Sequence, residues 1–241
     1  MDGLRINKFL AERAGLSRRE ADDAIESGRV LVDDKPARIG GRVNSGDVVM
    51  LDGREIPFET NFIYLALNKP VGYVCSRKRQ GETPTLYELL PEKYHNLKTV
   101  GRLDKDSSGL ILLTNDGDFA FRMTHPKFIK VKVYEVELNK DLEPLHQQEI
   151  SDFGVMLDDG VSRLMLSRLD DETSEGTSER QKNGSRRKWR VEMSEGRNRQ
   201  IRRTFKALGY NVEKLHRIKF GNYMLNGLKL GKYEEVKNDQ K

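Results

Sequence analysis

Residues 101–117 read Gly-Arg-Leu-Asp-Lys-Asp-Ser-Ser-Gly-Leu-Ile-Leu-Leu-Thr-Asn-Asp-Gly, a mainly polar segment followed at once by an apolar run. Short apolar runs bounded by turn-forming residues are typical of buried strands, so we expect a strand over residues 110–114. A polar loop that ends at such a strand is held at the edge of a rigid core, where functional side chains are often presented. This segment therefore predicts both a central strand and a candidate functional loop.

The chain on either side of this segment predicts a mixture of strands and helices. Strands and helices follow one another without a regular strand–helix repeat, so the fold class expected is α+β and not a doubly wound parallel sheet. Apolar or alternating runs indicate two further strands, at residues 62–67 and 131–138. Helical periodicity indicates three helices, at residues 117–123, 143–150 and 199–209.

The beginning of the chain has a different pattern. An apolar stripe indicates a helix over residues 4–15, and Ser17 with Glu20 has the spacing of a capping box that starts a second helix. After this second helix the period becomes alternating, which predicts a β-hairpin with strands near residues 30–32 and 46–51. The expected result is a small helix–helix–hairpin unit.

Length and composition support two domains. With 241 residues the chain can hold a small domain beside a medium one, at about 100–150 residues per domain. We place the boundary after residue 60, with the helix–helix–hairpin unit at 1–60 and the α+β body at 61–241. Charged residues make up 34% of the chain, above the roughly 25% typical of soluble domains. Residues 170–185 are polar without aliphatic side chains, and we interpret them as a mobile surface loop.

Several classes of protein are disfavoured. Cys75 is the only cysteine, so an intramolecular disulfide is excluded, and the four histidines have no zinc-site spacing. The N-terminal residues are mixed polar and apolar with an early acid at Asp2, unlike a signal peptide, and no run approaches the ~18 apolar residues of a membrane span. We expect a cytoplasmic protein with no metal site and no membrane association.

The distribution of charge is more informative than the net charge of +5. Between Lys182 and Lys219 there are 13 basic residues against three acids, whereas acids slightly outnumber bases in the first 59 residues. A strongly basic stretch favours phosphate-dominated, salt-sensitive binding to nucleic acid. A nuclear-localisation or solubilising run is the alternative, and the folded appearance of the segment disfavours it.

Taken alone, the aspartates of the 101–117 segment allow three interpretations. Asp104 or Asp106 could cap a turn, which is a common role for loop aspartates. The spacing Asp104-x-Asp106-x-Ser108-Gly109 also copies the opening of a calcium-binding loop, but Asn115 stands where such a loop needs a bidentate Glu. The third interpretation is that the loop carries a catalytic carboxylate.

A family resemblance favours the third interpretation. Gly101-Arg102-Leu103-Asp104, followed by Ser-Gly-Leu and Thr-Asn-Asp-Gly, closely resembles the signature of the ribosomal RNA pseudouridine synthases. The N-terminal unit resembles the small S-four-like RNA-binding module, which is typical of the small-subunit-type (Rsu) branch. The resemblance implies a catalytic domain built on a mixed, mainly antiparallel sheet. It extends over nearly the whole chain, through residues 69–72, 124–127, 195–203 and 208–210.

The resemblance also implies roles for residues of the larger body. Asp104 matches the family's catalytic carboxylate, and Arg202 matches the cation that balances it, a role suited to Arg because it stays charged. Tyr134 matches the active-site tyrosine that stacks on the flipped uracil. Leu103 and Ile201 are expected to line an apolar pocket. Without the resemblance, Arg202 could be a phosphate-binding surface residue and Tyr134 a packed strand residue.

RNA contacts are expected outside the pocket as well. A uridine that leaves its stack creates a gap, and Arg102 is the candidate to occupy it because its planar guanidinium can stack and donate hydrogen bonds. A loop-stabilising ion pair is the alternative role for Arg102, and a solvated helix surface is the alternative for the basic residues of the module. The remaining candidates for RNA binding are Arg5, Lys8, Arg18, Arg19, Arg29, Arg197, Arg199 and Arg203.

The implied reaction sets the expected cofactors and partners. Uridine becomes pseudouridine when the bond from the sugar to a ring nitrogen breaks and ring carbon five bonds to the same sugar carbon, so no oxidation state changes. No cofactor and no metal is therefore expected. The expected partner of the monomeric enzyme is structured ribosomal RNA, free or in a pre-ribosomal particle. A non-catalytic RNA-binding or ribosome-assembly protein is the main alternative, and a methyltransferase is disfavoured because no glycine-rich cofactor loop follows a strand.

Overall fold

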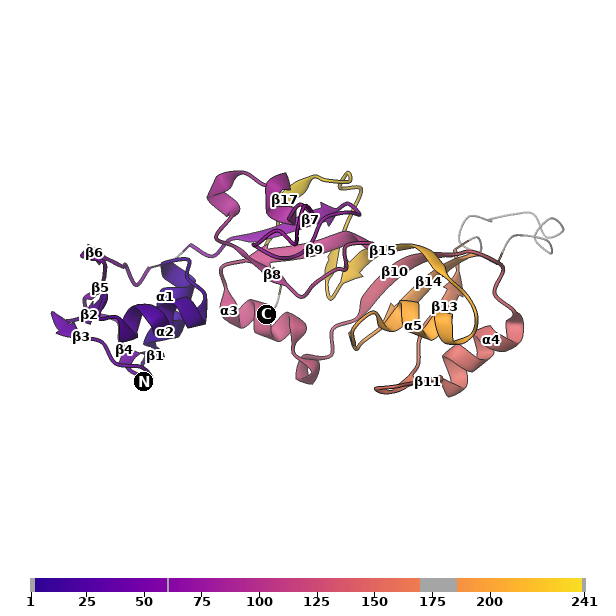
Figure 1. The fold of residues 1–241 in the computed structure, drawn as a ribbon, viewed down its shortest axis with the longest axis horizontal. Helices are drawn as coiled ribbons and strands as arrows, with labels where there is room; N and C mark the ends of the chain where they lie inside the picture. Colours follow the sequence, from indigo (N-terminus) through magenta and orange to yellow (C-terminus); the bar gives the residue numbers. More distant parts are fainter. Residues whose placement is uncertain (1–2, 60, 170–185, 240–241) are drawn as a thin grey trace.

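The computed structural model describes residues 3–59, 61–169 and 186–239. The segment 170–185, which the sequence predicts to be a mobile loop, lies outside these ranges. Residues 3–59 have a hydrophobic core of their own, separate from the cores of the larger α+β body. Figure 1 shows this N-terminal unit beside the larger body. Within the described ranges, no helix has the length and apolar character to cross a membrane.

In the N-terminal unit, two helices pack against small antiparallel sheets. The helices contribute Phe9, Leu10 and Ile25 to a core that is completed by Val30 and Val49 of the strands. The longer sheet has the order β3–β2–β5–β6, and β1 pairs with β4. The elements are β1 (Leu4–Arg5), α1 (Ile6–Arg13), α2 (Arg18–Glu26), β2 (Val30–Val32), β3 (Lys35–Pro36), β4 (Arg42–Val43), β5 (Val49–Leu51) and β6 (Arg54–Glu55).

The expected helix–helix–hairpin order is confirmed here, with one correction. The capping box is present, because Ser17 Oγ accepts from the Glu20 backbone N–H at 3.1 Å and Glu20 accepts from the Ser17 N–H at 2.6 Å. The first helix begins at Ile6 and not at Leu4, since Leu4 and Arg5 pair with Val43 and Arg42 in a short antiparallel strand.

The larger body is built on a mixed sheet. Among the described residues nine strands join, in the order β13–β14–β10–β15–β9–β7–β17, with β8 on β9 and β16 on β15. The pairing of β15 with β9 is parallel, and the other pairings among these described strands are antiparallel. The strands are β7 (Tyr64–Lys69), β8 (Lys98–Val100), β9 (Ser108–Thr114), β10 (Lys132–Leu138), β13 (Met165–Arg168), β14 (Lys188–Met193), β15 (Val212–Phe220), β16 (Tyr223–Met224) and β17 (Tyr233–Glu235).

Short helices cover the sheet, and a separate hairpin stands beside it. Leu65 and Leu67 of β7 pack with the helical turns at 86–94, while Ala66, from the other face of the strand, packs with Phe119 of α3. Ile201 and Phe205 of α5 belong to the same core as Leu65 and Leu67, so α5 and α3 pack against different faces of the sheet (both helices are labelled in Figure 1). The remaining elements are η1 (Leu86–Leu89), η2 (Glu92–Tyr94), α3 (Gly117–Thr124), η3 (Pro126–Phe128), α4 (Pro144–Gln148), η4 (Glu149–Phe153), the hairpin β11 (Val155–Leu157) and β12 (Gly160–Ser162), and α5 (Gln200–Ala207).

The strands and helices expected in this body are confirmed within a few residues. One helix is altered, because the predicted helix at 143–150 is α4 followed by the π-helical turn η4. Two central strands, β14 and β15, lie in the stretch that the sequence marks only as basic. The α+β class and the mixed, mainly antiparallel sheet are as expected.

The parallel pair of β9 and β15 depends on one glycine. Gly109 lies directly opposite Arg217 in the register, and its φ is +106°. A Cβ at Gly109 would lie 2.2 Å from the Arg217 carbonyl oxygen and 2.4 Å from its backbone nitrogen. Only glycine lets the two strands approach this closely, and the strand pair in turn sets the position of the loop that precedes β9.

The N-terminal unit contacts the larger body through α1. Lys8 Nζ lies 2.6 Å from the Asp118 carboxylate of α3, and Lys98 Nζ donates to the Ala11 carbonyl at 3.2 Å. Glu12 is buried at this contact beside Gly117, and burial raises the pKa of its carboxyl above the usual value. Lys8, which the sequence predicts to bind RNA, is therefore engaged in the contact between the two units.

Candidate active site

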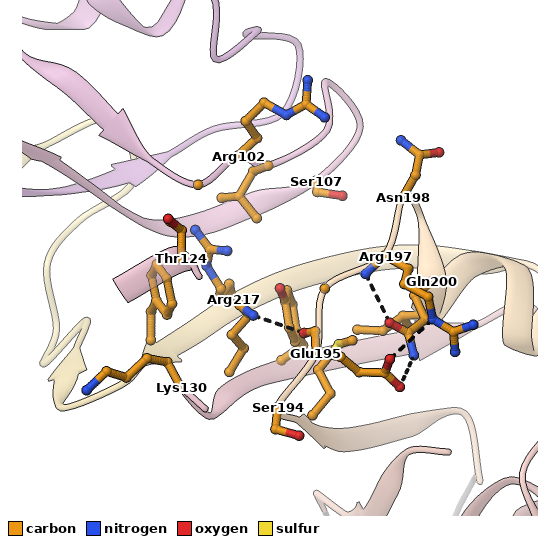
Figure 2. A pocket seen from close by; sticks show the side chains of 18 of the residues that line it. Arg102, Ser107, Thr124, Lys130, Ser194, Glu195, Arg197, Asn198, Gln200 and Arg217 are labelled. Carbon is orange, nitrogen blue, oxygen red and sulfur yellow. Dashed lines mark hydrogen bonds and ion pairs between the residues drawn. The ribbon is translucent and has the colours of Figure 1, made fainter. Parts of the chain in front are cut away.

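A pocket of about 520 Å³ lies where the loop before β9 meets β10, β15 and the segment before α5. Its size falls within the range of about 300–1,000 Å³ that is usual for ligand sites. Polar groups converge on it from parts of the chain that are far apart in the sequence (Figure 2). The lining includes Arg102, Leu103, Asp104, Ser107, Thr124, Lys130, Lys132, Tyr134, Glu195, Arg197, Arg199, Ile201, Arg217 and Phe220.

Asp104 presents its carboxylate to this pocket. Its Oδ2 lies 3.3 Å from Arg199 Nη1, and about a third of the side chain, 35%, is exposed. The backbone of the loop is fixed, because Ser107 N–H donates to the Asp104 carbonyl at 3.1 Å and Gly72 N–H donates to the Lys105 carbonyl at 2.7 Å. The turn is thus closed by backbone groups, and the partly exposed Asp104 side chain takes no part in closing it.

Two arginines of the α5 region hold the neighbouring Asp106. Arg199 makes a bidentate pair with the Asp106 carboxylate at 2.9 and 2.8 Å. Arg202 Nε lies 3.4 Å from Asp106 Oδ2, while its Nη groups donate to the carbonyls of Val212 and Asp106, both at 2.7 Å. These contacts join the loop that carries Asp106 to the start of α5 and hold the two together.

The expected pairing of Arg202 with Asp104 is corrected by this arrangement. Arg199 precedes the first residue of α5 with a left-handed backbone, φ +47°, which places its guanidinium over both aspartates. Arg202 lies almost one turn later, and its guanidinium is held by Val212 and by Asp106. The cation in contact with Asp104 is therefore Arg199.

The Asp106 pair predicts a pH dependence of stability. Hydrogen bonding from Arg199 holds the pKa of the Asp106 carboxyl below its usual 3.8 in the folded state. A depressed folded-state pKa adds stability above the unfolded-state pKa, and this stability is lost as the pH falls through the folded-state pKa. We expect Asp106→Asn to lower the Tm at about pH 7 and the difference from the native chain to shrink below about pH 4. Thermal unfolding of the native chain and of Asp106→Asn across this pH range measures the two Tm values. A Tm difference that grows in acid would contradict the prediction.

The apolar side of the pocket includes Leu103, Tyr134 and Ile201. Tyr134 on β10 is buried with 8% exposure, and the guanidinium carbon of Arg217 lies 6.0 Å from the centre of its ring. Leu103 and Ile201 are buried at 7% and 4% exposure and belong to the main hydrophobic core. A flat ring beside two aliphatic side chains forms a surface suited to one face of a planar base.

Arg102 stands at the mouth of the pocket. Its side chain is exposed, and Figure 2 shows it extending away from Arg217 and Glu195 on the opposite wall. No hydrogen bond or ion pair joins its guanidinium to any residue of the described ranges. The loop-stabilising ion pair that the sequence left open for Arg102 is not formed here.

Two arginines predicted to bind RNA are instead held within the protein. Arg197 lines the pocket, but it donates to the Asp159, Gly160 and Val161 carbonyls of the β11–β12 hairpin at 3.0, 3.0 and 2.8 Å. Arg203 makes a bidentate pair with Asp159 at 3.0 and 2.6 Å. These contacts show that both guanidinium groups fix the hairpin to α5, and RNA binding by the two residues stays a prediction.

The basic residues of the N-terminal unit lie away from the pocket. Arg5 and Arg19 are exposed on this unit. Arg18 donates to the Asn7 side chain at 3.2 Å, and Arg29 pairs with Asp52, with Nε–Oδ1 at 2.7 Å. Arg5, Arg18 and Arg19 are therefore exposed, whereas Arg29 is in an ion pair and Lys8 lies at the contact with α3.

Sequence reasoning missed a buried lysine behind the pocket and two cations that line it. Lys69 is fully buried at the end of β7, where its ammonium donates to the Pro70 and Ser107 carbonyls at 2.9 and 2.8 Å, and burial lowers its pKa. Arg217 and Lys132 line the pocket from β15 and β10. The alternating pattern of residues 212–220 is the signal that would have placed Arg217 on the inward face of a strand.

A metal site is not evident in the described part of the chain. No group of three or more His, Cys, Asp or Glu residues is arranged there to hold an ion. The two loop aspartates face Arg199 instead. The arrangement offers a carboxylate, an aromatic ring and donor groups around one cavity.

Comparison with known sequence families assigns this fold and site to a class of enzyme. The pattern of the RNA pseudouridylate synthases matches residues 63–207, and the pattern of the S4 domain matches residues 4–49. The chain belongs to the RNA pseudouridine synthase family and has an S4 domain at its N-terminal end. It is an isomerase that converts uridine to pseudouridine in RNA.

Individual relatives cover almost the whole chain. Ribosomal small subunit pseudouridine synthase A of Pasteurella multocida is 35% identical, over 98% of this chain and 97% of the relative. The dual-specificity RNA pseudouridine synthase RluF of Salmonella typhi is 36% identical, over 98% of this chain and 76% of the relative. A solved structure described as a pseudouridylate synthase is 30% identical and superimposes with a TM-score of 0.65, covering 98% of this chain and 96% of the other. The family predicted from the sequence is confirmed.

Proposed function

We propose that this enzyme isomerises one or a few uridines of structured ribosomal RNA, with Asp104 as the catalytic carboxylate. The observation that carries this proposal is the placement of the Asp104 carboxylate in the same pocket as the Tyr134 ring, with Arg199 3.3 Å from the carboxylate. Ribosomal RNA is favoured because a relative that matches over 97% of its own length is named as a ribosomal small subunit enzyme.

The target uridine must leave its helical stack to reach Asp104. Extrusion of a base costs a few kcal/mol, and enzymes of this kind recover that cost from contacts to the flipped base. Tyr134, Leu103 and Ile201 offer those contacts as an apolar, partly aromatic surface inside the pocket. Arg102 at the mouth is placed to occupy the gap that the base leaves, since its guanidinium is exposed and extends outward.

The chemistry places a definite demand on Asp104. The C1′–N1 bond breaks, the uracil turns over, a C5–C1′ bond forms, C5 loses a proton and N1 gains one. An ionised carboxylate serves by adding to the sugar or the ring, or by removing a proton from the ribose to give a glycal-like intermediate. Arg199 balances the charge of Asp104 and fixes its orientation in either route, while Arg202 holds Asp106 and thereby the loop.

The N-terminal unit serves as an RNA anchor in this proposal. We assign it residues 1–60 and assign residues 61–241 to the catalytic domain, since each part has a hydrophobic core of its own. The exposed Arg5, Arg18 and Arg19 of the anchor suit contacts to phosphates, which position an RNA without reading its sequence. The enzyme works as a monomer in the cytoplasm, on ribosomal RNA that is free or within a pre-ribosomal particle.

Direct conversion tests the proposal. Purified full-length chain is incubated with ribosomal RNA transcribed without modification, and pseudouridine is mapped by chemical labelling and mass spectrometry. We expect conversion at one or a few positions, and the same positions to lose pseudouridine in cells that lack the protein. Binding of the RNA without conversion at any position would favour the ribosome-assembly alternative.

A further inference from the structure

A buried arginine on the pocket wall has more donors than acceptors. Arg217 is 2% exposed, and its Nε donates to the Leu110 carbonyl at 2.7 Å. Its Nη2 is buried and has no hydrogen-bond partner in the described residues. Its charge is not balanced by a carboxylate, because no Asp or Glu of the described ranges forms an ion pair with it. A buried charge of this kind costs free energy unless a partner is supplied.

Two lysines gather around the same point. The Arg217 guanidinium carbon lies 4.9 Å from the centre of the Phe220 ring, and Lys132 Nζ lies 5.6 Å from the centre of the same ring. Lys130 lines the same wall and passes next to Gly221, where a Cβ would lie 3.7 Å from Lys130 Cδ. Figure 2 shows Arg217 beside Thr124, with Lys130 extending below them. We call Lys130, Lys132 and Arg217 the cationic wall.

Within the described residues, the carboxylates of the pocket form no ion pair with Arg217 or Lys132. Asp104 and Glu195 are the carboxylates among the described lining residues, and Asp104 is in contact with Arg199. The Glu195 oxygens are 2.9 Å from Gln200 Nε2 and 3.3 Å from Arg197 Nε, and Lys132 bonds to the Glu195 backbone carbonyl at 2.9 Å. Burial and the charge of Arg217 lower the pKa of Lys132, consistent with cations crowded at one place.

We propose that the cationic wall binds a backbone phosphate flanking the target uridine, and that it thereby sets how far the nucleotide enters the pocket. The inference rests on the proposed function and adds a substrate subsite to it. A phosphate fits better than a uracil carbonyl because it carries a full negative charge and several acceptor oxygens, enough for Arg217 and both lysines. The base then lies against Asp104 and Tyr134, and the flanking phosphate lies beside Arg217 and Lys132, next to the Tyr134 ring.

The test uses the RNA fragment that the native enzyme converts. Two fragments carry a neutral methylphosphonate at the linkage 5′ or 3′ of the target uridine, and a third is unmodified. Single-turnover rates and apparent affinities are measured for the native chain, Arg217→Met, Lys132→Met and Lys127→Met. Lys127 is the matched control, because it lies in the segment between α3 and β10 but is exposed and outside the pocket lining.

One of the two neutral linkages should slow the native enzyme by about 10- to 100-fold, the effect of losing one or two charge-assisted hydrogen bonds. Arg217→Met and Lys132→Met should react slowly with unmodified RNA, and the neutral linkage that slows the native enzyme should reduce their rates little further. Lys127→Met should be slowed by that linkage as much as the native chain is. The proposal is overturned when neither linkage changes the native rate by more than about 2-fold, or when every chain loses the same factor. The native chain alone can overturn the proposal, and Arg217→Met and Lys132→Met test the wall independently, so one variant that fails to fold does not spoil the test. Absence of conversion of unmodified RNA would count against the proposed function instead.

Discussion

Replacing Asp104 by Asn should lower the rate of pseudouridine formation by at least about 1000-fold while leaving RNA binding within a few-fold of the native value. Asn keeps the shape of the side chain but has no negative charge and can neither add to carbon as a carboxylate nor accept a proton at neutral pH. The loop should stay in place, because its turn is closed by backbone hydrogen bonds. Single-turnover conversion of ribosomal RNA and a filter-binding isotherm measure the two effects separately.

Asp106→Asn is the matched control, since it makes the same change two residues away in the same loop. The Asp106 carboxylate is engaged by Arg199 and Arg202 and is not part of the pocket lining. Its loss should loosen the loop and reduce the rate by about 10-fold or less. Equal losses for the two variants, or an Asp104→Asn rate within about 10-fold of native, would show that Asp104 is not the group that reacts.

Replacing Gly109 by Ala should destabilise the larger domain severely. The added Cβ would lie 2.2 Å from the Arg217 carbonyl oxygen, a backbone atom that cannot move without breaking the β9–β15 pair, and φ at this residue is +106°. We expect the free energy of unfolding to fall by about 4 kcal/mol or more, among the largest effects of single substitutions. Denaturant unfolding measures it.

Gly160→Ala separates the two causes of this effect. Gly160 has nearly the same φ, +109°, but a Cβ there would meet only Arg197 Nη1 at an ordinary 3.7 Å. Its cost should therefore be the backbone strain alone, about 1–2 kcal/mol. If the two variants lose equal stability, the close approach of β15 to β9 is not the reason that position 109 is glycine.

Local signals in the sequence predicted local structure well. The capping box at Ser17 and the apolar run after Gly109 depend on neighbours within a few residues, and both are present as expected. Strands β14 and β15 were missed because their outward residues are charged, so the segment was interpreted by its charge. The alternation in Lys-Trp-Arg-Val-Glu-Met, residues 188–193, predicts a strand once charge is set aside.

The partners of the arginines could not be predicted in this way. The Asp159 carboxylate forms ion pairs with Arg203 and Arg197, although these arginines lie 44 and 38 residues further along the chain. Which of Arg199 and Arg202 meets Asp104 depends on where α5 begins, and helix ends are the least reliable part of a sequence prediction. The cationic wall likewise exists only once β10 and β15 lie side by side.

The parallel pairing of β9 with β15 also orders events during synthesis of the protein. His216 and Arg217 meet Ser108 and Gly109 only after more than a hundred intervening residues have left the ribosome. Contacts of such large separation form late, because closing the long loop costs chain entropy before the contact can compensate. A nascent chain that ends before β15 carries the Asp104 loop without the part of the pocket that Leu215, Arg217 and Phe220 line, so the pocket forms only after β15 has been synthesised.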